Sequence, residues 1–183
     1  MRLFKQFRTR AIQSFVVFGL LQLCACEVLA KEPLVVFLVR HAEKAAEGRD
    51  PELTSAGKTR AKELANVLRD AKLAHVHSTD FVRTRDTAGP VAARFDLDVE
   101  LYNPANLPAF VRTLRKNGGR HLIVGHSNTT PAAVAMFGGE PGDPIREPDE
   151  FDRLYIVTVN DVGKTTTVLM RYGTTDKAKG SSR

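Results

Sequence analysis

The sequence predicts an α/β domain, a three-layer sandwich with a mainly parallel central sheet. Strand-like and helix-like segments alternate from Glu32 onwards, and strands separated by helices usually pair in parallel. The first strand-like segment, "LVVFLV" at 34–39, is a continuous apolar run rich in β-branched residues, which is typical of a strand buried on both faces. The chain has 183 residues, of which 43% are hydrophobic, so it suits one domain with its own core.

Hydrophobic spacing and stop signals predict the remaining elements in order. We expect five more strands, at 75–79, 99–101, 121–126, 154–159 and 165–171, with the last two forming a hairpin around "NDVGK". We expect four helices, at Ser55–Ala71, 81–95, Asn106–Lys116 and a short one from Thr130-Pro131. Thr54 is a suitable cap for the first helix, and Pro90 suggests a kink or an earlier break in the second.

Residues 1–30 have the pattern of a signal peptide. A cationic head precedes an apolar run from about Ala11 to Leu23, which is short for a membrane span, and small residues follow. The "VLA" triplet fits cleavage after Ala30, whereas "LCAC" ending at Cys26 resembles an imperfect lipoprotein box, and an uncleaved anchor is the third alternative. We therefore expect a protein that is exported to the periplasm or secreted. Cleavage after Ala30 would remove both cysteines, leaving a domain at 31–173 without a disulfide.

The charge balance does not indicate a nucleic-acid partner. The net charge is +6, but residues 1–30 hold four basic residues against the single acidic Glu27, so half of the net charge belongs to that segment. We predict no nucleic-acid partner and no stable membrane span after signal cleavage. The polar segment 174–183 is expected to be a disordered tail.

Three predicted strands lead into residues that suit phosphate chemistry. Arg40 and His41 follow the first strand, Arg83 follows the second, and His126 ends the central one. Ligands of open α/β sheets collect beyond the carboxyl ends of the strands, so these residues should lie close together. Guanidinium groups match phosphate oxygens in pairs, and a neutral imidazole is a nucleophile for phosphorus.

Four segments together resemble the histidine phosphatase superfamily, the phosphoglycerate mutase-like group. They are "LVRHAEK" with His41, "LTSAGKTRA", "STDFVRTRDTA" with Arg83 and "IVGHSNTTP" with His126, and the match spans about 34–172. The resemblance implies that His41 becomes a phosphohistidine, that Arg40 and Arg83 hold phosphoryl oxygens, and that His126 is the second histidine of the phosphate pocket. It also implies a metal-independent phosphoric monoester hydrolase that uses no cofactor and acts on a small phosphorylated substrate.

The residue that would protonate the leaving oxygen does not emerge from the motifs. Many members of the family carry a Glu or Asp for this step after the second motif, but Glu100 is the only Glu of "DLDVELYNPANLPAF" and its spacing does not match. Ser127 stands where other members have an Asp after the second histidine. Glu43, Glu147 and Asp152 are the other candidates. The family's phosphohistidine phosphatases lack this donor, although they work in the cytoplasm.

These observations favour an exported phosphatase and leave two alternatives. One is a catalytically weak phospho-ligand-binding or envelope-associated protein, and the other is a phosphatase for lipopolysaccharide sugar phosphates. His75 and His77 share one strand face and could suggest a metal pair, but no third ligand is evident nearby in the sequence, so we interpret them, and His121, as structural. The sequence predicts neither the physiological substrate nor the oligomeric state.

Overall fold

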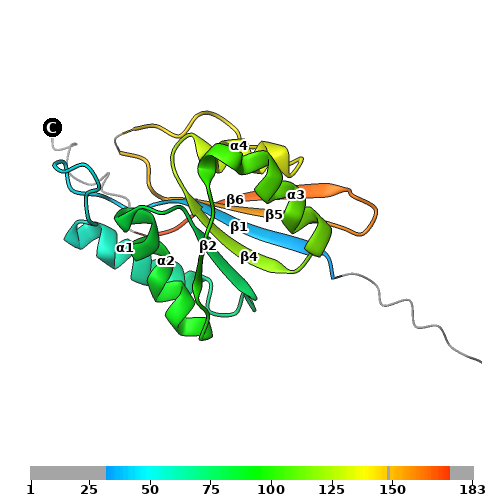
Figure 1. Ribbon diagram of the computed structural model, residues 1–183, viewed down its shortest axis with the longest axis horizontal. Helices are drawn as coiled ribbons and strands as arrows, with labels where there is room; N and C mark the ends of the chain where they lie inside the picture. Colours follow the sequence, from blue (N-terminus) through cyan, green and yellow to red (C-terminus); the bar gives the residue numbers. More distant parts are fainter. Residues whose placement is uncertain (1–31, 148, 174–183) are drawn as a thin grey trace, which may run out of the picture.

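The computed structural model describes residues 32–147 and 149–173, so the predicted signal peptide and tail lie outside the described residues. Its centre is one six-stranded sheet with the order β3-β2-β4-β1-β5-β6 (Figure 1). The strands are β1 (Leu34–Arg40), β2 (His75–Ser78), β3 (Val99–Leu101), β4 (Arg120–Gly125), β5 (Arg153–Val159) and β6 (Thr165–Arg171). The pairs β1–β4, β2–β4 and β2–β3 are parallel, whereas β5 is antiparallel to both β1 and β6. The sheet is therefore mixed but mainly parallel, as predicted.

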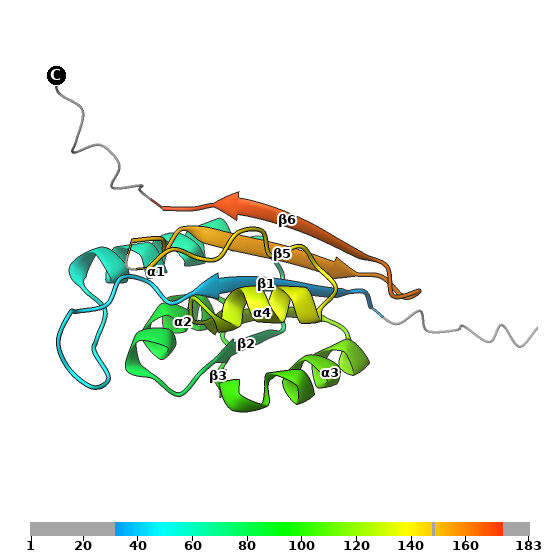
Figure 2. The ribbon, with the colours of Figure 1, turned by 90° about the horizontal axis from the view of Figure 1, so that it is seen from above.

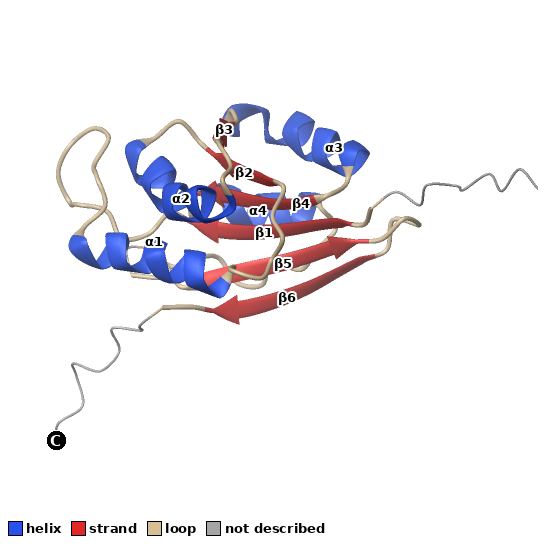
Figure 3. Ribbon diagram, turned by 90° about the horizontal axis from the view of Figure 1, so that it is seen from below, coloured by secondary structure: helices blue, strands red, loops and turns tan. Residues whose placement is uncertain are grey.

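Helices cover both faces of this sheet and complete the three layers. Helices α1 (Ser55–Val67) and α2 (Val82–Phe95) lie on the face seen in Figure 3, and α3 (Leu107–Asn117) and α4 (Thr129–Met136) lie on the face seen in Figure 2. A short 3-10 helix, η1 (Pro104–Asn106), leads into α3. Each face has its own apolar core, because alternate residues of β1 point to opposite sides: Val36 packs towards α3 and α4, and Phe37 towards α1 and α2.

Strand β1 explains how the sheet brings distant segments together. All seven of its residues are buried, and it pairs with β4 on one side and β5 on the other. The register places Arg40 opposite Gly125, and the neighbouring β2–β4 register places Ser78 opposite Val124. The carboxyl ends of β1, β2 and β4 therefore meet at one edge of the sheet.

One helix is shorter than predicted, and another continues through a proline. Helix α1 ends at Val67 rather than Ala71, because the chain then closes a turn in which Ala71 N donates to Leu68 O at 2.8 Å. Helix α2 has almost the predicted extent, 81–95, and it continues through Pro90 to Phe95, so of the two alternatives that Pro90 suggested the earlier break is wrong. Val91, fully buried against the core behind Pro90, provides packing that offsets the hydrogen bond that proline lacks.

No helix in the described part of the chain is both long and apolar enough to cross a membrane.

Candidate active site

His41 is held by its own backbone at the point where β1 ends. Its amide donates to Gly125 O of β4 at 2.9 Å, and the next amide, of Ala42, donates to Thr87 Oγ1 of α2 at 3.0 Å. Its Nδ1 lies 2.7 Å from Ala42 O, a carbonyl that can only accept, so Nδ1 carries the proton. The Nε2 of a neutral His41 is then a free lone pair, the atom required for nucleophilic attack.

A close helix–loop contact fixes the chain just after His41. A Cβ at Gly57 would lie 2.2 Å from Glu43 O, so only glycine allows the first turn of α1 to pack on that backbone. Thr54 caps the same turn, accepting from Gly57 N at 3.1 Å, and its own amide donates to Glu43 O at 2.9 Å. The "LTSAGKTRA" segment therefore braces the loop that carries the nucleophile candidate.

Arg40 is buried beside His41, with its side chain only 2% exposed. One guanidinium nitrogen donates to Glu147 Oε1 at 2.9 Å and another to Glu150 O at 3.0 Å, and the ring of Phe151 lies 4.1 Å from the guanidinium carbon. Its Nε is buried and has no hydrogen-bond partner among the described residues. Arg40 thus keeps one donor that the described protein does not satisfy.

Arg83 comes from the first turn of α2 and shares this feature. Its guanidinium stacks over Phe81 at 4.4 Å and contacts Asp50 Oδ1 at 3.3 Å, while its side chain is 14% exposed. Its Nε is also buried without a partner in the described part of the chain. The positive charges of Arg83 and Arg40 both act on His41 and His126, which places all four predicted site residues in one cluster.

His126 is oriented by the end of β2 and by the start of α4. Its amide donates to Thr129 Oγ1 at 2.9 Å, and its Nε2 lies 3.0 Å from Thr79 Oγ1. Because the Thr79 hydroxyl already donates to Thr84 Oγ1 at 3.0 Å, it accepts from His126, whose proton is therefore on Nε2. The rings of His41 and His126 meet edge to face with centroids 5.6 Å apart.

Burial keeps both imidazoles neutral. Burial, with the nearby charges of Arg40, Arg83 and His126, lowers the pKa of His41 to about 3, although its hydrogen bond to Ala42 O acts in the opposite direction. Burial and the same two arginines lower the pKa of His126 to about 4. The site therefore combines two cations with two uncharged imidazoles at neutral pH.

Of the four candidate proton donors, only Glu147 lies at this cluster. Glu43 pairs with Arg60 at 2.7 Å, and Asp152 pairs with Arg171 at 2.6 Å. Glu100, in the middle of β3, contacts His75 at 2.7 Å and His77 at 3.4 Å. Glu147 accepts from Ser127 Oγ at 2.6 Å and from Arg40, and these contacts hold its pKa below the usual value, so it is ionised at neutral pH.

A cavity of ≈ 710 Å³ lies next to this cluster but does not include His41 or His126 in its lining. Phe151 lines it and also covers Arg40. We therefore locate the candidate site by the side chains around His41 and not by this cavity.

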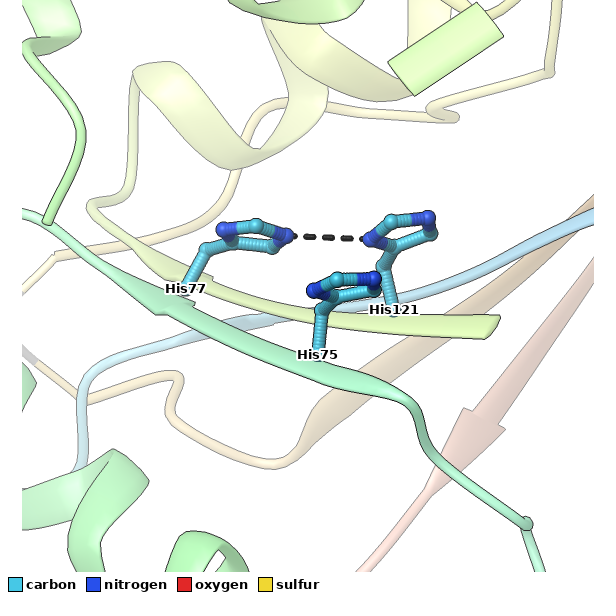
Figure 4. A group of neighbouring side chains, drawn as sticks. All are labelled: His75, His77 and His121. Carbon is cyan, nitrogen blue, oxygen red and sulfur yellow. Dashed lines mark hydrogen bonds between the residues drawn. The ribbon is translucent and has the colours of Figure 1, made fainter. Parts of the chain in front are cut away.

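One negative prediction from the sequence is wrong. The parallel pairing of β2 with β4 places His121 beside His75 and His77, so a third ring nitrogen does lie near the pair (Figure 4).

Sequence reasoning also missed Thr79, Thr87 and Phe151, which orient or cover the site residues. A buried Thr directly after a strand that leads into a basic motif is the one signal that could have indicated Thr79.

The sequence model of the histidine phosphatase superfamily, branch 1, matches residues 36–103, which include Arg40, His41 and Arg83. The matched stretch runs from β1 through β3, so this part of the chain is similar to the histidine phosphatase superfamily. No curated protein sequence matches this chain significantly. His126 lies beyond the stretch matched by the superfamily model, and it joins the site through the β1–β4 pairing.

Several solved phosphatase structures show the same fold at low sequence identity. The protein histidine phosphatase SixA, solved with tungstate, is 20% identical with a TM-score of 0.62, and the match covers 75% of this chain and 97% of that one. A candidate phosphohistidine phosphatase SixA from Agrobacterium tumefaciens is 19% identical with a TM-score of 0.59, covering 78% of this chain and 99% of that one. A phosphoserine phosphatase mutant from Entamoeba histolytica, solved with phosphoserine, is 14% identical with a TM-score of 0.57, covering 78% of this chain and 98% of that one.

Proposed function

We propose that this chain is an exported, metal-independent phosphatase that hydrolyses a phosphorylated substrate through a phosphohistidine on His41. The observation that carries the proposal is the hydrogen bond from His41 Nδ1 to Ala42 O at 2.7 Å, which leaves Nε2 as a lone pair near the buried Arg40 and the partly buried Arg83. The hydrogen bond from Nδ1–H to the carbonyl also stabilises the positive charge that the ring acquires when Nε2 bonds to phosphorus.

Arg40 and Arg83 bind the phosphoryl group of the substrate. The Nε atoms of Arg40 and Arg83 are buried without protein partners in the described structure, and a phosphoryl group brings several acceptor oxygens. Satisfying two buried donors with an anion removes a desolvation cost of about 1–3 kcal/mol for each. The similarity of residues 36–103 to the superfamily model supports the same role, and tungstate, the oxyanion in the solved SixA structure, resembles phosphate in shape and charge.

The proposed reaction has two steps. His41 Nε2 forms a bond to phosphorus while the bond from phosphorus to the leaving oxygen breaks, and that oxygen departs with the electron pair. Water then attacks phosphorus, the nitrogen–phosphorus bond breaks with its electron pair returning to Nε2, and one water proton is lost to solvent. The positive charges of Arg40 and Arg83 stabilise the charge on the phosphoryl oxygens in both steps.

His126 assists by taking up a proton from solvent when the phosphoryl group binds. Its Nε2–H is held by Thr79, so Nδ1 is the nitrogen that changes protonation. A bound dianion favours the charged imidazole, and Nδ1 would then donate to a phosphoryl oxygen. Thr79 thereby fixes which nitrogen of His126 serves the substrate.

Substrates with good leaving groups should be preferred. Glu147 is the only candidate donor at the cluster and is ionised when it pairs with Arg40, so it does not hold the proton that a poor leaving oxygen needs. A phosphoramidate, an acyl phosphate or an aryl phosphate departs without that help. A SixA-like phosphohistidine is a phosphoramidate of this kind, and this chemistry fits the relatives that carry the fold.

The proposal is tested by a panel of phosphorylated compounds with the chain that lacks residues 1–30. We expect turnover of nitrophenyl phosphate and phosphoramidate, and loss of turnover with His41→Ala at unchanged thermal stability. Binding of vanadate without any turnover across the panel, which includes lipopolysaccharide sugar phosphates, would instead support the phospho-ligand-binding alternative.

Export is tested separately with the full chain. Cell fractionation followed by N-terminal sequencing should find the protein outside the cytoplasm with Lys31 as its first residue. A lipid-modified Cys26 at the amino end would support lipoprotein processing, and a cytoplasmic protein that begins at Met1 would contradict export.

A further inference from the structure

Three histidines from two adjacent strands form a cluster away from the phosphate site. His75 and His77 lie on one face of β2, and the β2–β4 register pairs His75 with His121. One ring nitrogen from each of the three lies within 4.8 Å of the others. Figure 4 shows the three rings side by side on the sheet, with His77 and His121 facing each other through nitrogen atoms.

The outer nitrogen of each ring already contacts an oxygen acceptor. Glu100 on β3 lies 2.7 Å from His75 Nδ1 through one carboxylate oxygen and 3.4 Å from His77 Nδ1 through the other. The carbonyl of Gly118 lies 2.8 Å from His121 Nε2. The hydrogen bonds of His75 and His121 place protons on their outer nitrogens, which leaves lone pairs on His75 Nε2 and His121 Nδ1. A proton on His77 Nδ1, which faces Glu100, would leave a third lone pair on His77 Nε2. Carboxylates and carbonyls behind the rings are also the usual supports of metal-binding histidines.

The two inner nitrogens of the buried rings then oppose each other. His77 Nε2 and His121 Nδ1 are 3.0 Å apart, so without a metal His77 Nε2–H donates to His121 Nδ1. That tautomer leaves the lone pair of His77 Nδ1 facing the Glu100 carboxylate at 3.4 Å, which is an unfavourable contact. An additional proton would put a charged imidazole in a buried place, since His77 is 4% and His121 2% exposed. A metal ion bound to both lone pairs satisfies every ring nitrogen without a buried imidazolium.

We propose that His75, His77 and His121 bind a divalent transition-metal ion of the zinc type, with Glu100 and Gly118 O supporting the rings. Three neutral imidazoles with a further open position are a common zinc ligand set, and borderline ions of this type prefer imidazole to the harder magnesium or calcium ligands. Tetrahedral binding at about 2.0–2.1 Å requires nitrogen atoms about 3.3 Å apart, so the buried pair is already close to the needed spacing. The ring of His75 stacks on that of His121 with centroids 4.7 Å apart, so it must rotate to turn its Nε2 towards the buried pair, and its 45% exposed side chain has room to do so.

This site would tie together the two strands that position the phosphate site. β2 leads into Thr79 and β4 leads into His126; His75 and His121 lie at the amino ends of these strands, and His77 lies two residues before Thr79. None of the proposed ligands is a phosphate-site residue, so we expect the metal to act on the stability of the β2–β4 pair.

The test is a calorimetric titration of zinc into the metal-free, tag-free full chain at pH 7.5. Cys24→Ser and Cys26→Ser are made first, because thiolates of the N-terminal segment also bind zinc. We expect one ion per chain with a dissociation constant of about 10 µM or tighter. His75→Gln, an exposed substitution that should not unfold the chain, should weaken binding by at least about 10-fold. The matched control, His41→Gln with His126→Gln, changes the two histidines outside the cluster and should leave zinc affinity unchanged.

A second readout separates this site from adventitious binding. Saturating zinc should raise the Tm of the parent chain by several degrees and should raise that of His75→Gln much less. Glu100→Gln should weaken zinc binding by about 10–100-fold, as expected for a support behind the ligands. The proposal is overturned if zinc shows no saturable binding up to about 100 µM, if His75→Gln binds zinc as the parent does, or if the His41/His126 control loses the binding.

Discussion

Replacing Glu147 by Gln separates two possible roles of the carboxylate that pairs with Arg40. Glu147 accepts from Arg40 at 2.9 Å, and Arg40 is 2% exposed while Glu147 is 59% exposed. An ionised Glu147 competes with a phosphoryl oxygen for Arg40, whereas a protonated one would act as the acid for the leaving group. The ionised role is favoured because the Ser127 and Arg40 contacts lower its pKa.

The expected size of the effect follows from the exposure of this pair. A hydrogen bond to a charged group contributes about 1.5–3 kcal/mol when buried, but an exposed ion pair contributes only about 0.2–1 kcal/mol. For a buried arginine with a mostly exposed partner we take about 1 kcal/mol, which is about a 5-fold change in affinity. Glu147→Gln should therefore lower the inhibition constant of vanadate and the KM of nitrophenyl phosphate by about 5-fold.

The assay measures kcat/KM for nitrophenyl phosphate and for an alkyl phosphate of similar size. The ratio of the two values should be the same in Glu147→Gln as in the parent enzyme. Asp149→Asn is the matched control, because Asp149 is an exposed carboxylate paired with Arg146 and not with Arg40. The reasoning is refuted if Glu147→Gln slows the alkyl phosphate by about 10²–10⁴-fold and spares the aryl phosphate, since that is the loss expected of a general acid.

Three further predictions concern the arginine, the metal and the histidines. Arg83→Ala should weaken vanadate binding by at least about 10-fold, and Arg83→Lys should restore only part of it because an ammonium lacks the planar fork; full restoration would show that Arg83 acts only as a charge. Phosphatase activity should survive exhaustive chelation while the Tm falls, and activity that EDTA removes and zinc restores would contradict metal-independent chemistry. His41 and His126 have lowered pKa values in the folded state, about 3 and about 4, so the unfolded chain binds more protons below pH 6.5 and stability falls as the pH is lowered. Urea unfolding at pH 7 and pH 5 should show this loss. His126→Gln should reduce it by about 1 kcal/mol, since His126 is partly exposed and solvent screens part of the effect; an equal loss in the variant would place the pKa of His126 near its normal value.

The sequence predicted those parts of the fold that depend on local patterns. The buried run of β1 and the Thr54 cap of α1 are local signals, and both elements lie where the patterns indicated. The helix does not break at Pro90, because the burial of Val91 and the rest of the α2 face offsets the low helix propensity of proline. A prediction from local propensity alone does not include that burial.

The site was predictable in its main residues because each follows a strand. Arg40, His41 and His126 lie at carboxyl ends of strands, where parallel sheets gather ligands, and the general rule was sufficient to group them. Their roles in the reaction stay predictions until turnover is measured.

The remaining contacts depend on strand order and register, which one sequence does not contain. His121 joins His75 and His77 only because β4 lies next to β2 and pairs His75 with His121. Phe151 reaches Arg40 from a loop far along the chain, and no local pattern marks such a contact. The structure therefore adds the covering and orienting residues, and the histidine cluster, to a site that the motifs had outlined.

The central claim is tested most directly by trapping the phosphorylated enzyme. The chain is mixed with a radioactive aryl phosphate, quenched with alkali within one turnover and digested for peptide mapping by mass spectrometry. The account predicts an acid-labile, alkali-stable phosphoryl group on His41 that forms as fast as the product is released and is absent from His41→Ala. Full turnover without a labelled peptide, or a label on any residue other than His41, would contradict it.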